Sequence, residues 1–175
     1  MAPVRIAARL AALAAAAVSF ATPIAAQPAE SERPTLVVAI SVDQLSSDLF
    51  NQYREHFSGG LARLMGGAVF PSGYQAHAAT ETCPGHSTIL TGAHPARTGI
   101  IGNDWIELDV GREDTEVYCA EDTSVEGSSS EDYTVSPVHL LVPTLGDLLK
   151  QADPESRVVS IAGKDRSAVM LGGHR

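Results

Sequence analysis

The sequence predicts an α/β fold with a mostly parallel central sheet flanked by helices. Two continuous apolar runs rich in β-branched residues, 35–42 and 157–162, suit strands that are buried on both faces. Segments with helical patterning lie between them, so strand and helix alternate along the chain. In such folds, ligands bind beyond the carboxyl ends of the strands. Asp43, Lys164 and Arg166 follow the two runs and are therefore the first candidate site residues.

The remaining elements are expected in a regular order between these runs. Ser46, Ser47 and Asp48 can cap a helix over 49–57, and Thr144 is a candidate cap for a later helix. Further expected elements are a short helix at 61–65, a short strand at 68–70, a hairpin of 104–109 and 116–119, an acidic surface loop at 121–137, and a helix at 144–151. Residues 164–171 are expected to lead into further strands.

Residues 1–26 have the pattern of a signal peptide. Arg5 and Arg9 precede an apolar run at 10–20, and small residues follow it. The run is too short and too rich in alanine for a stable membrane anchor, although an uncleaved anchor is the alternative. We therefore expect a periplasmic or secreted protein whose folded part is 27–175.

The chain is acidic, with a formal net charge of −9. This charge argues against binding to nucleic acid or to anionic membranes. A phosphate site would need local positive charge from metal ions and a few side chains. The two cysteines, Cys83 and Cys119, can form one disulfide in an exported protein, or they can stay unpaired.

The segment Thr82-Cys83-Pro84-Gly85-His86 is the strongest local signal. Proline is tolerated where a helix begins, so Pro84 predicts a helix with Thr82 at its N-terminus. Free N–H groups and the helix dipole favour negative charge there. From position alone, Thr82 is a nucleophile or a helix cap, and Asp43 is a metal ligand or a cap. His86 is expected to be packed or hydrogen-bonded.

Three segments, taken in this order, resemble the alkaline phosphatase superfamily. They are VVAISVDQ at 37–44, TETCPGHSTILTGAHPARTGIIGNDW at 80–105, and SIAGKDRSAVMLGG at 160–173. They are most similar to bacterial zinc alkaline phosphatases with a threonine nucleophile, which are related to the nucleotide pyrophosphatase/phosphodiesterases. Sulfatases of the superfamily need Cys or Ser where this chain has Thr82, and Arg where it has His86, so the resemblance argues against a sulfatase.

The resemblance implies a role for five residues. Asp43 would be a metal ligand, and Thr82 would be the nucleophile and would also contact a metal. Asn103 would donate to a phosphoryl oxygen, while Lys164 and Arg166 would meet the remaining charge. The implied activity is hydrolysis of small-molecule phosphate monoesters with two Zn²⁺ ions, through a phosphothreonine intermediate. The alternatives are a nucleotide pyrophosphatase/phosphodiesterase, and a non-catalytic exported domain that binds phosphate or a partner.

The number of metal ligands predicts an N-terminal part of a catalytic domain. Two zinc ions need about eight ligand positions, and this chain offers Asp43 and Thr82. The resemblance implies that the other ligands lie downstream of the Lys-x-Arg segment, where only 171–175 follow. We therefore expect a fold that is incomplete at its C-terminus and inactive alone. His174 is not expected to replace a missing ligand.

Overall fold

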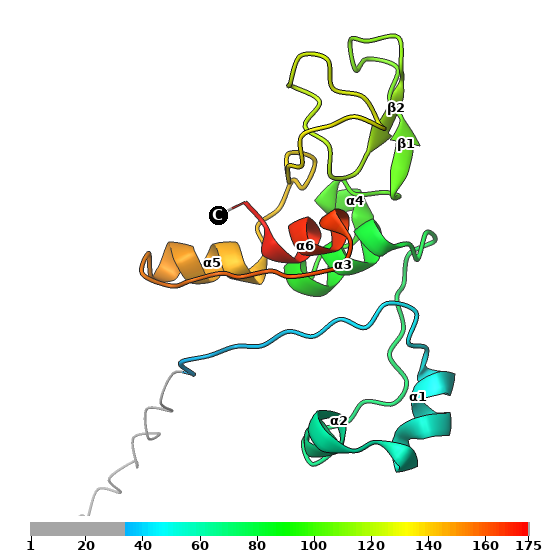
Figure 1. Ribbon diagram of the computed structural model, residues 1–175, viewed down its shortest axis with the longest axis vertical. Helices are drawn as coiled ribbons and strands as arrows, with labels where there is room; N and C mark the ends of the chain where they lie inside the picture. The colour runs from blue at the N-terminus through cyan, green and yellow to red at the C-terminus, as the bar shows by residue number, and fades with distance from the viewer. Residues whose placement is uncertain (1–33, 175) are drawn as a thin grey trace, which may run out of the picture. The chain divides into compact units, whose positions relative to one another are not determined.

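The computed structural model describes residues 34–174 (Figure 1), so the predicted signal peptide lies outside the described residues. The chain divides into two units, Met1–Ala39 and Ile40–Arg175, and 34–39 contain no helix or strand. The elements of the second unit are α1 (Ser47–Tyr53), the 3₁₀ helix η1 (Arg54–His56), α2 (Gly59–Leu64), α3 (Thr82–Thr91), α4 (Pro95–Thr98), β1 (Asp104–Ile106), β2 (Glu116–Tyr118), α5 (Leu145–Ala152) and α6 (Asp165–Gly172).

Two helices begin at the caps that the sequence predicts. The Ser46 hydroxyl accepts a hydrogen bond from the Leu49 amide at 3.2 Å, at the start of α1. Thr144 caps α5, and Asp147 returns a hydrogen bond to the Thr144 amide, which completes a capping box. The hairpin is also confirmed, because β1 and β2 pair antiparallel with Trp105 opposite Val117.

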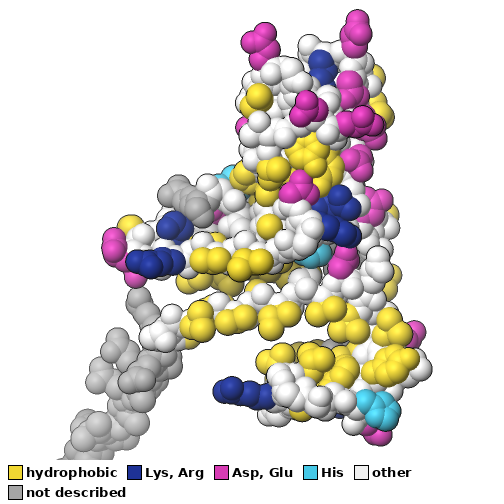
Figure 2. Space-filling view, viewed as in Figure 1, with side chains coloured by type: hydrophobic (Ala, Val, Ile, Leu, Met, Phe, Trp, Pro, Cys, Tyr) yellow, Lys and Arg dark blue, Asp and Glu magenta, His cyan; other side chains and the backbone are white. Residues whose placement is uncertain are grey.

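The predicted core strands run extended but have no strand partner among residues 34–174. In that part of the chain, the sheet consists of β1 and β2, and 40–42, 68–70 and 157–162 are not strands. Most of their side chains are exposed, with Phe70 at 86% and Ile161 at 88%. Figure 2 shows such hydrophobic side chains gathered on the surface in yellow. A buried parallel strand needs neighbours beside it and helices over both faces, and the described residues do not supply them.

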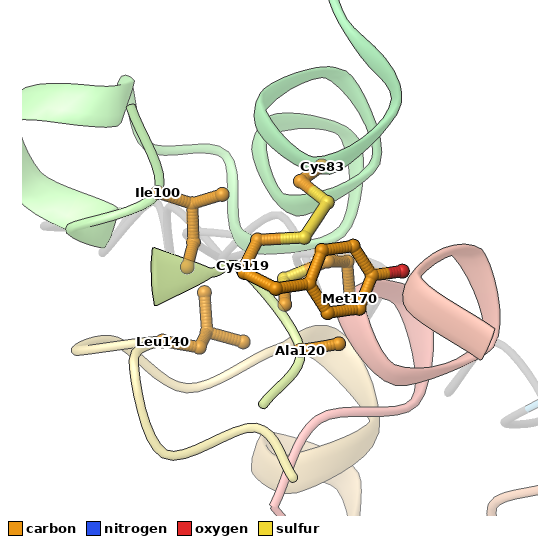
Figure 3. Close-up of a cluster of buried hydrophobic side chains, with 7 residues drawn as sticks. Cys83, Ile100, Cys119, Ala120, Leu140 and Met170 are labelled. Atoms are coloured by element: carbon orange, nitrogen blue, oxygen red, sulfur yellow. A yellow bond between two sulfur atoms is a disulfide. The ribbon is translucent and has the colours of Figure 1, made fainter. Parts of the chain in front are cut away.

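The core lies where α3, α6 and the end of β2 meet. Its buried side chains are Cys83, Ile100, Tyr118, Cys119, Ala120, Leu140 and Met170 (Figure 3). Gly99 ends α4 in the left-handed conformation, with φ at 81°. A Cβ atom at Gly99 would lie 2.8 Å from the His139 carbonyl oxygen, so both the conformation and the space require glycine there.

The sequence predicts that residues 164–171 lead into further strands, but the structure has helix α6 there. It begins at Asp165, packs against α3, and buries Ser167 and Met170. Its eight residues are too few for a clear helical period. Contact with α3 therefore stabilises a helix that local sequence signals only weakly.

The predicted acidic surface loop contains a fully buried carboxylate, which the sequence reading missed. Glu121 is 0% exposed, and its carboxylate accepts hydrogen bonds from both Nη atoms of Arg112 and from the Tyr118 amide. Burial raises the pKa of Glu121, but these hydrogen bonds outweigh burial and hold the pKa below its usual value. Glu121 therefore anchors the start of the loop both to β2, through the Tyr118 amide, and to the β1–β2 connection, which carries Arg112.

Replacing Glu121 with Gln is expected to lower the free energy of unfolding at pH 7 by about 3 kcal/mol, since Arg112 loses its buried partner. Because the folded-state pKa of Glu121 is lowered, the charge stabilises the fold above the unfolded-state pKa of about 4.3. That contribution is lost as the pH falls through the folded-state pKa. Urea unfolding at pH 7 and below pH 4 measures both effects. The control is Glu126→Gln, an exposed carboxylate in the same loop, and equal behaviour of the two variants would contradict the anchor.

Candidate functional site

Thr82 lies in the first turn of α3, where the sequence predicts it. The helix begins at Thr82, two residues before Pro84. Proline fits there because the amides of a first helical turn have no partner within the helix. Thr82 is 7% exposed, and its hydroxyl donates to Asp43 Oδ2 at 3.3 Å. The threonine thus stands at a helix N-terminus with a carboxylate beside its oxygen.

Asp43 and Lys164 meet although 121 positions separate them. Lys164 Nζ lies 3.3 Å from the Oδ2 atom that also accepts from Thr82. Burial raises the pKa of Asp43. Hydrogen bonds from Lys164 and Thr82 lower the pKa by more than burial raises it, so the pKa lies below its usual value. Gln44 follows with φ at 62°, the one non-glycine residue from 34 to 174 with positive φ. The chain therefore changes direction at the residue that follows Asp43.

Asn103 is held from three directions beside the start of α3. Its amide donates to Glu81 Oε2 at 2.6 Å, and its carbonyl accepts from the Cys119 amide at 2.8 Å. Its side-chain Oδ1 accepts from the Cys83 amide at 2.9 Å. With Oδ1 used by the helix terminus, the NH₂ group is the part of the side chain that can donate to a ligand.

Lys164 and Arg166 are brought to this region by the start of α6. Lys164 is the N-cap residue, and its side chain reaches Asp43. Arg166 turns instead toward β2, where Nη1 donates to the Tyr118 hydroxyl at 3.2 Å. The two cations therefore have different partners, and both lie at one end of α6.

An open depression of about 430 Å³ lies on one side of Asp43 and is lined in part by Asp43, Glu81, Gly85 and His86, whereas Lys164 and Arg166 do not line it. His86 is 6% exposed, and its Nδ1 lies 2.8 Å from the Thr82 carbonyl oxygen. This confirms the expectation that His86 is hydrogen-bonded. It also fixes the imidazole within the first turns of α3.

Cys83 and Cys119 form a disulfide, which resolves the alternative that the sequence left open (Figure 3). The bond closes a separation of 36 residues, and a crosslink of that length stabilises a fold by about 4 kcal/mol in the chain-entropy view. It joins the residue after Thr82 to the residue after Tyr118. Cys83 therefore has no free thiol to act as a nucleophile.

The described residues contain few metal ligands. Between 34 and 174 there is no group of three or more His, Cys, Asp or Glu side chains that could hold an ion. Of the residues that the sequence predicts as metal ligands, Asp43 and Thr82 lie together, with their oxygen atoms 3.3 Å apart. His174 is engaged elsewhere, with Nδ1 at 2.9 Å from Asp147 and Nε2 at 2.7 Å from the Leu140 carbonyl oxygen. It ties the end of α6 to α5.

Sequence reasoning missed three residues that support the site. Glu81 holds the Asn103 backbone, while Tyr118 and Asp165 surround Arg166. Glu81 and Asp165 each adjoin a candidate residue, and that adjacency was the available signal. Tyr118 had none, because it reaches Arg166 from 48 positions away.

The chain is similar to one protein family and to several alkaline phosphatases. Residues 37–171 match the family described as type I phosphodiesterase / nucleotide pyrophosphatase. The chain is 66% identical over 141 residues to alkaline phosphatase PhoK of Sphingomonas sp, covering 80% of this chain and 25% of that protein. It is 58% identical over 139 residues to alkaline phosphatase PhoD of Zymomonas mobilis, covering 79% of this chain and 24% of that protein. The chain thus spans about a quarter of the length of these relatives.

Two solved structures of alkaline phosphatase PafA are also similar. The wild-type structure matches with a TM-score of 0.64 and 31% identity, over 75% of this chain and 26% of PafA. A PafA mutant with one threonine, one asparagine, one lysine and one arginine replaced matches with a TM-score of 0.66 and 29% identity, over 76% and 26%. These matches confirm the α/β class predicted from the sequence, of which this chain holds a part. No helix among residues 34–174 is long and apolar enough to cross a membrane.

Proposed function

Because the chain belongs to the type I phosphodiesterase / nucleotide pyrophosphatase family, we propose that it holds the nucleophile region of a zinc-dependent alkaline phosphatase. The proposed reaction is hydrolysis of phosphate monoesters through a phosphothreonine formed on Thr82. The observation that carries the proposal is the Thr82 hydroxyl, placed at the N-terminus of α3 and 3.3 Å from Asp43 Oδ2. The names of PhoK, PhoD and PafA support a phosphatase.

Each candidate residue has a role that suits its position. Thr82 attacks phosphorus, and the positive end of the α3 dipole favours the negative charge that gathers on the phosphoryl oxygens. Asn103 donates through its NH₂ group, since Oδ1 is taken by the Cys83 amide. Arg166 offers a planar fork of donors and Lys164 a point charge. The PafA mutant supports this set, because it replaces the same four residue types in the same order. Its threonine and asparagine have the same separation as Thr82 and Asn103.

The donor atoms of Asp43 and Thr82 are of a chemical type that suits a divalent metal ion. Asp43 contributes a carboxylate oxygen and Thr82 a hydroxyl oxygen, and these two atoms lie 3.3 Å apart. Zinc accepts carboxylate oxygen, and coordination to a metal ion is one way to activate a hydroxyl nucleophile. Two donors are half of a four-coordinate set, so we propose that the others come from the part of the relatives' length that this chain does not span. When bound, zinc supplies stabilisation of the Thr82 alkoxide.

A phosphodiesterase or pyrophosphatase of the same family is the second candidate, favoured by the family match itself. Two cations weigh against it. Lys164 and Arg166 lie at one end of α6, and a dianionic monoester brings more charge to such a pair than a monoanionic diester does. A non-catalytic domain that binds phosphate or a partner remains the third candidate.

We also propose that the protein is exported to the periplasm or secreted. The sequence of residues 1–26 supports this location. The disulfide between Cys83 and Cys119 supports it independently, because such bonds persist mainly in oxidising compartments.

The proposal is tested with protein expressed from the whole gene. It is expected to hydrolyse p-nitrophenyl phosphate faster than bis-p-nitrophenyl phosphate, to lose activity with a chelator, and to regain activity with Zn²⁺. Residues 27–175 expressed alone are expected to hydrolyse neither ester with added Zn²⁺, because residues 34–174 contain no group of three or more His, Cys, Asp or Glu side chains that could hold an ion. Faster diester hydrolysis by the whole protein would favour the phosphodiesterase. Zinc-dependent turnover by 27–175 that Thr82→Ala removes would contradict the incomplete ligand set.

A further inference from the structure

The Asp165 carboxylate collects hydrogen bonds from two tyrosines that are distant in sequence. The Tyr118 hydroxyl donates to Oδ1 at 2.7 Å, and the Tyr133 hydroxyl donates to Oδ2 at 2.9 Å. The Arg166 amide donates to Oδ1 at 2.7 Å. The two tyrosine rings also contact each other, with centroids 4.7 Å apart. Asp165 therefore fixes both hydroxyl groups at the start of α6.

Only one of these hydroxyl groups meets the Arg166 guanidinium among the described residues. Nη1 of Arg166 donates to the Tyr118 oxygen at 3.2 Å, and the guanidinium carbon lies 5.8 Å from the Tyr118 ring centroid. A phenol has one proton, and Tyr118 directs it to Asp165, so its oxygen is left to accept from Arg166. Burial, together with Asp165, raises the pKa of Tyr118, which keeps this proton in place at neutral pH. A directed chain thus runs from Arg166 through Tyr118 to Asp165.

The end of β2 also reaches the other half of the site. Cys119 follows Tyr118 and is bonded to Cys83, the residue after Thr82. The Cys119 amide donates to the Asn103 carbonyl at 2.8 Å. Two consecutive residues, 118 and 119, therefore contact the segments that carry the candidate nucleophile and the candidate arginine.

From these contacts we propose that Tyr118 is a positioning residue, which holds the Arg166 guanidinium in a fixed orientation by bridging it to Asp165. This inference rests on the proposed function, in which Arg166 binds a phosphoryl group. Tyr118 does not act on the substrate. It limits the orientations of Arg166, so that the guanidinium does not have to be reordered when negative charge develops on a bound phosphoryl group.

Tyr133 supplies a matched control. Both Tyr118→Phe and Tyr133→Phe remove one hydroxyl donor from Asp165 and keep an aromatic ring. Only Tyr118→Phe also removes the acceptor of Arg166 Nη1. A purely structural role of the cluster predicts similar effects of the two variants, whereas positioning of Arg166 predicts different ones.

The kinetic test uses protein from the whole gene and p-nitrophenyl phosphate. Tyr118→Phe is expected to lower kcat/KM about tenfold, and Tyr133→Phe less than about twofold. In an Arg166→Ala background, Tyr118→Phe should cause almost no further loss, because the group that it positions is gone. Equal losses in the two tyrosine variants, or an undiminished loss in the Arg166→Ala background, would overturn the inference.

A second readout needs no turnover. The rotation of the Arg166 guanidinium is measured by ¹⁵N NMR in arginine-labelled protein. Rotation is expected to be about tenfold faster in Tyr118→Phe than in the parent and in Tyr133→Phe. Equal rates in all three proteins would overturn the inference even in an active monoesterase. If the guanidinium rotates at the expected rates but the protein hydrolyses no ester, the positioning role is supported and the proposed function is contradicted.

Discussion

Replacing Thr82 with alanine is expected to lower monoester hydrolysis by at least about a thousandfold in protein expressed from the whole gene. The change removes the oxygen that attacks phosphorus, so the covalent route is lost. A thousandfold loss corresponds to about 4 kcal/mol of transition-state stabilisation. The fold should tolerate the change, since within residues 34–174 the Thr82 side chain makes one hydrogen bond, to Asp43. Steady-state rates and the midpoint of thermal unfolding measure the two quantities.

Thr82→Ser is the matched control. Serine keeps a hydroxyl at the N-terminus of α3 and beside Asp43, so it should retain a substantial part of the activity. Brief incubation with ³²P-labelled monoester followed by an acid quench should label the parent protein and the serine variant, and leave the alanine variant unlabelled. Full turnover or full labelling of Thr82→Ala would show that another group accepts the phosphoryl group.

Local sequence signals predicted those parts of the fold that depend on local interactions. Ser46 and Thr144 begin helices because a side-chain oxygen caps the first free amides, and such a signal lies within a few residues. The β1–β2 hairpin follows from the same short-range logic. Helix α6 could not be found in this way, since its stability depends on contact with α3, which lies far away in sequence.

Burial was the quantity that the sequence predicted least well. The run at 157–162 has the composition of a buried strand, yet Val159 is 79% exposed. The composition of a segment shows that it could form a buried strand. Burial also needs neighbouring strands and helices, which the described residues do not include. Glu121 shows the reverse case, because a carboxylate in an acidic loop is fully buried once Arg112 pairs with it.

The candidate site could be predicted in part for a physical reason. Asp43 and Lys164 each follow a strand-like run, and the structure brings their side chains within 3.3 Å. The expectation that ligand-binding residues follow strand-like runs placed both residues correctly in sequence, although the runs before them are not strands among residues 34–174. Tyr118 could not be found, since its contact with Arg166 depends on how the hairpin packs against α6.

Loss of the two candidate phosphate-binding cations is expected to distinguish monoesters from diesters. In protein from the whole gene, Lys164→Ala and Arg166→Ala should each lower kcat/KM for p-nitrophenyl phosphate by about a hundredfold. The loss for bis-p-nitrophenyl phosphate should be about tenfold or less. A monoester dianion carries one more negative charge than a diester monoanion, and each cation stabilises that extra charge.

The two cations should differ in how their loss affects the rest of the site. Lys164→Ala also removes a partner of Asp43, whereas Arg166→Ala leaves the pair of Asp43 and Thr82 untouched. Lys164→Ala is therefore expected to change the zinc concentration needed for half-maximal activity, and Arg166→Ala is not. Lys150→Ala is the control for charge alone, because Lys150 donates to the Ser156 carbonyl in a different part of the unit. Equal losses on both esters would remove the reason for preferring a monoesterase, since the cations would then recognise a feature common to both substrates.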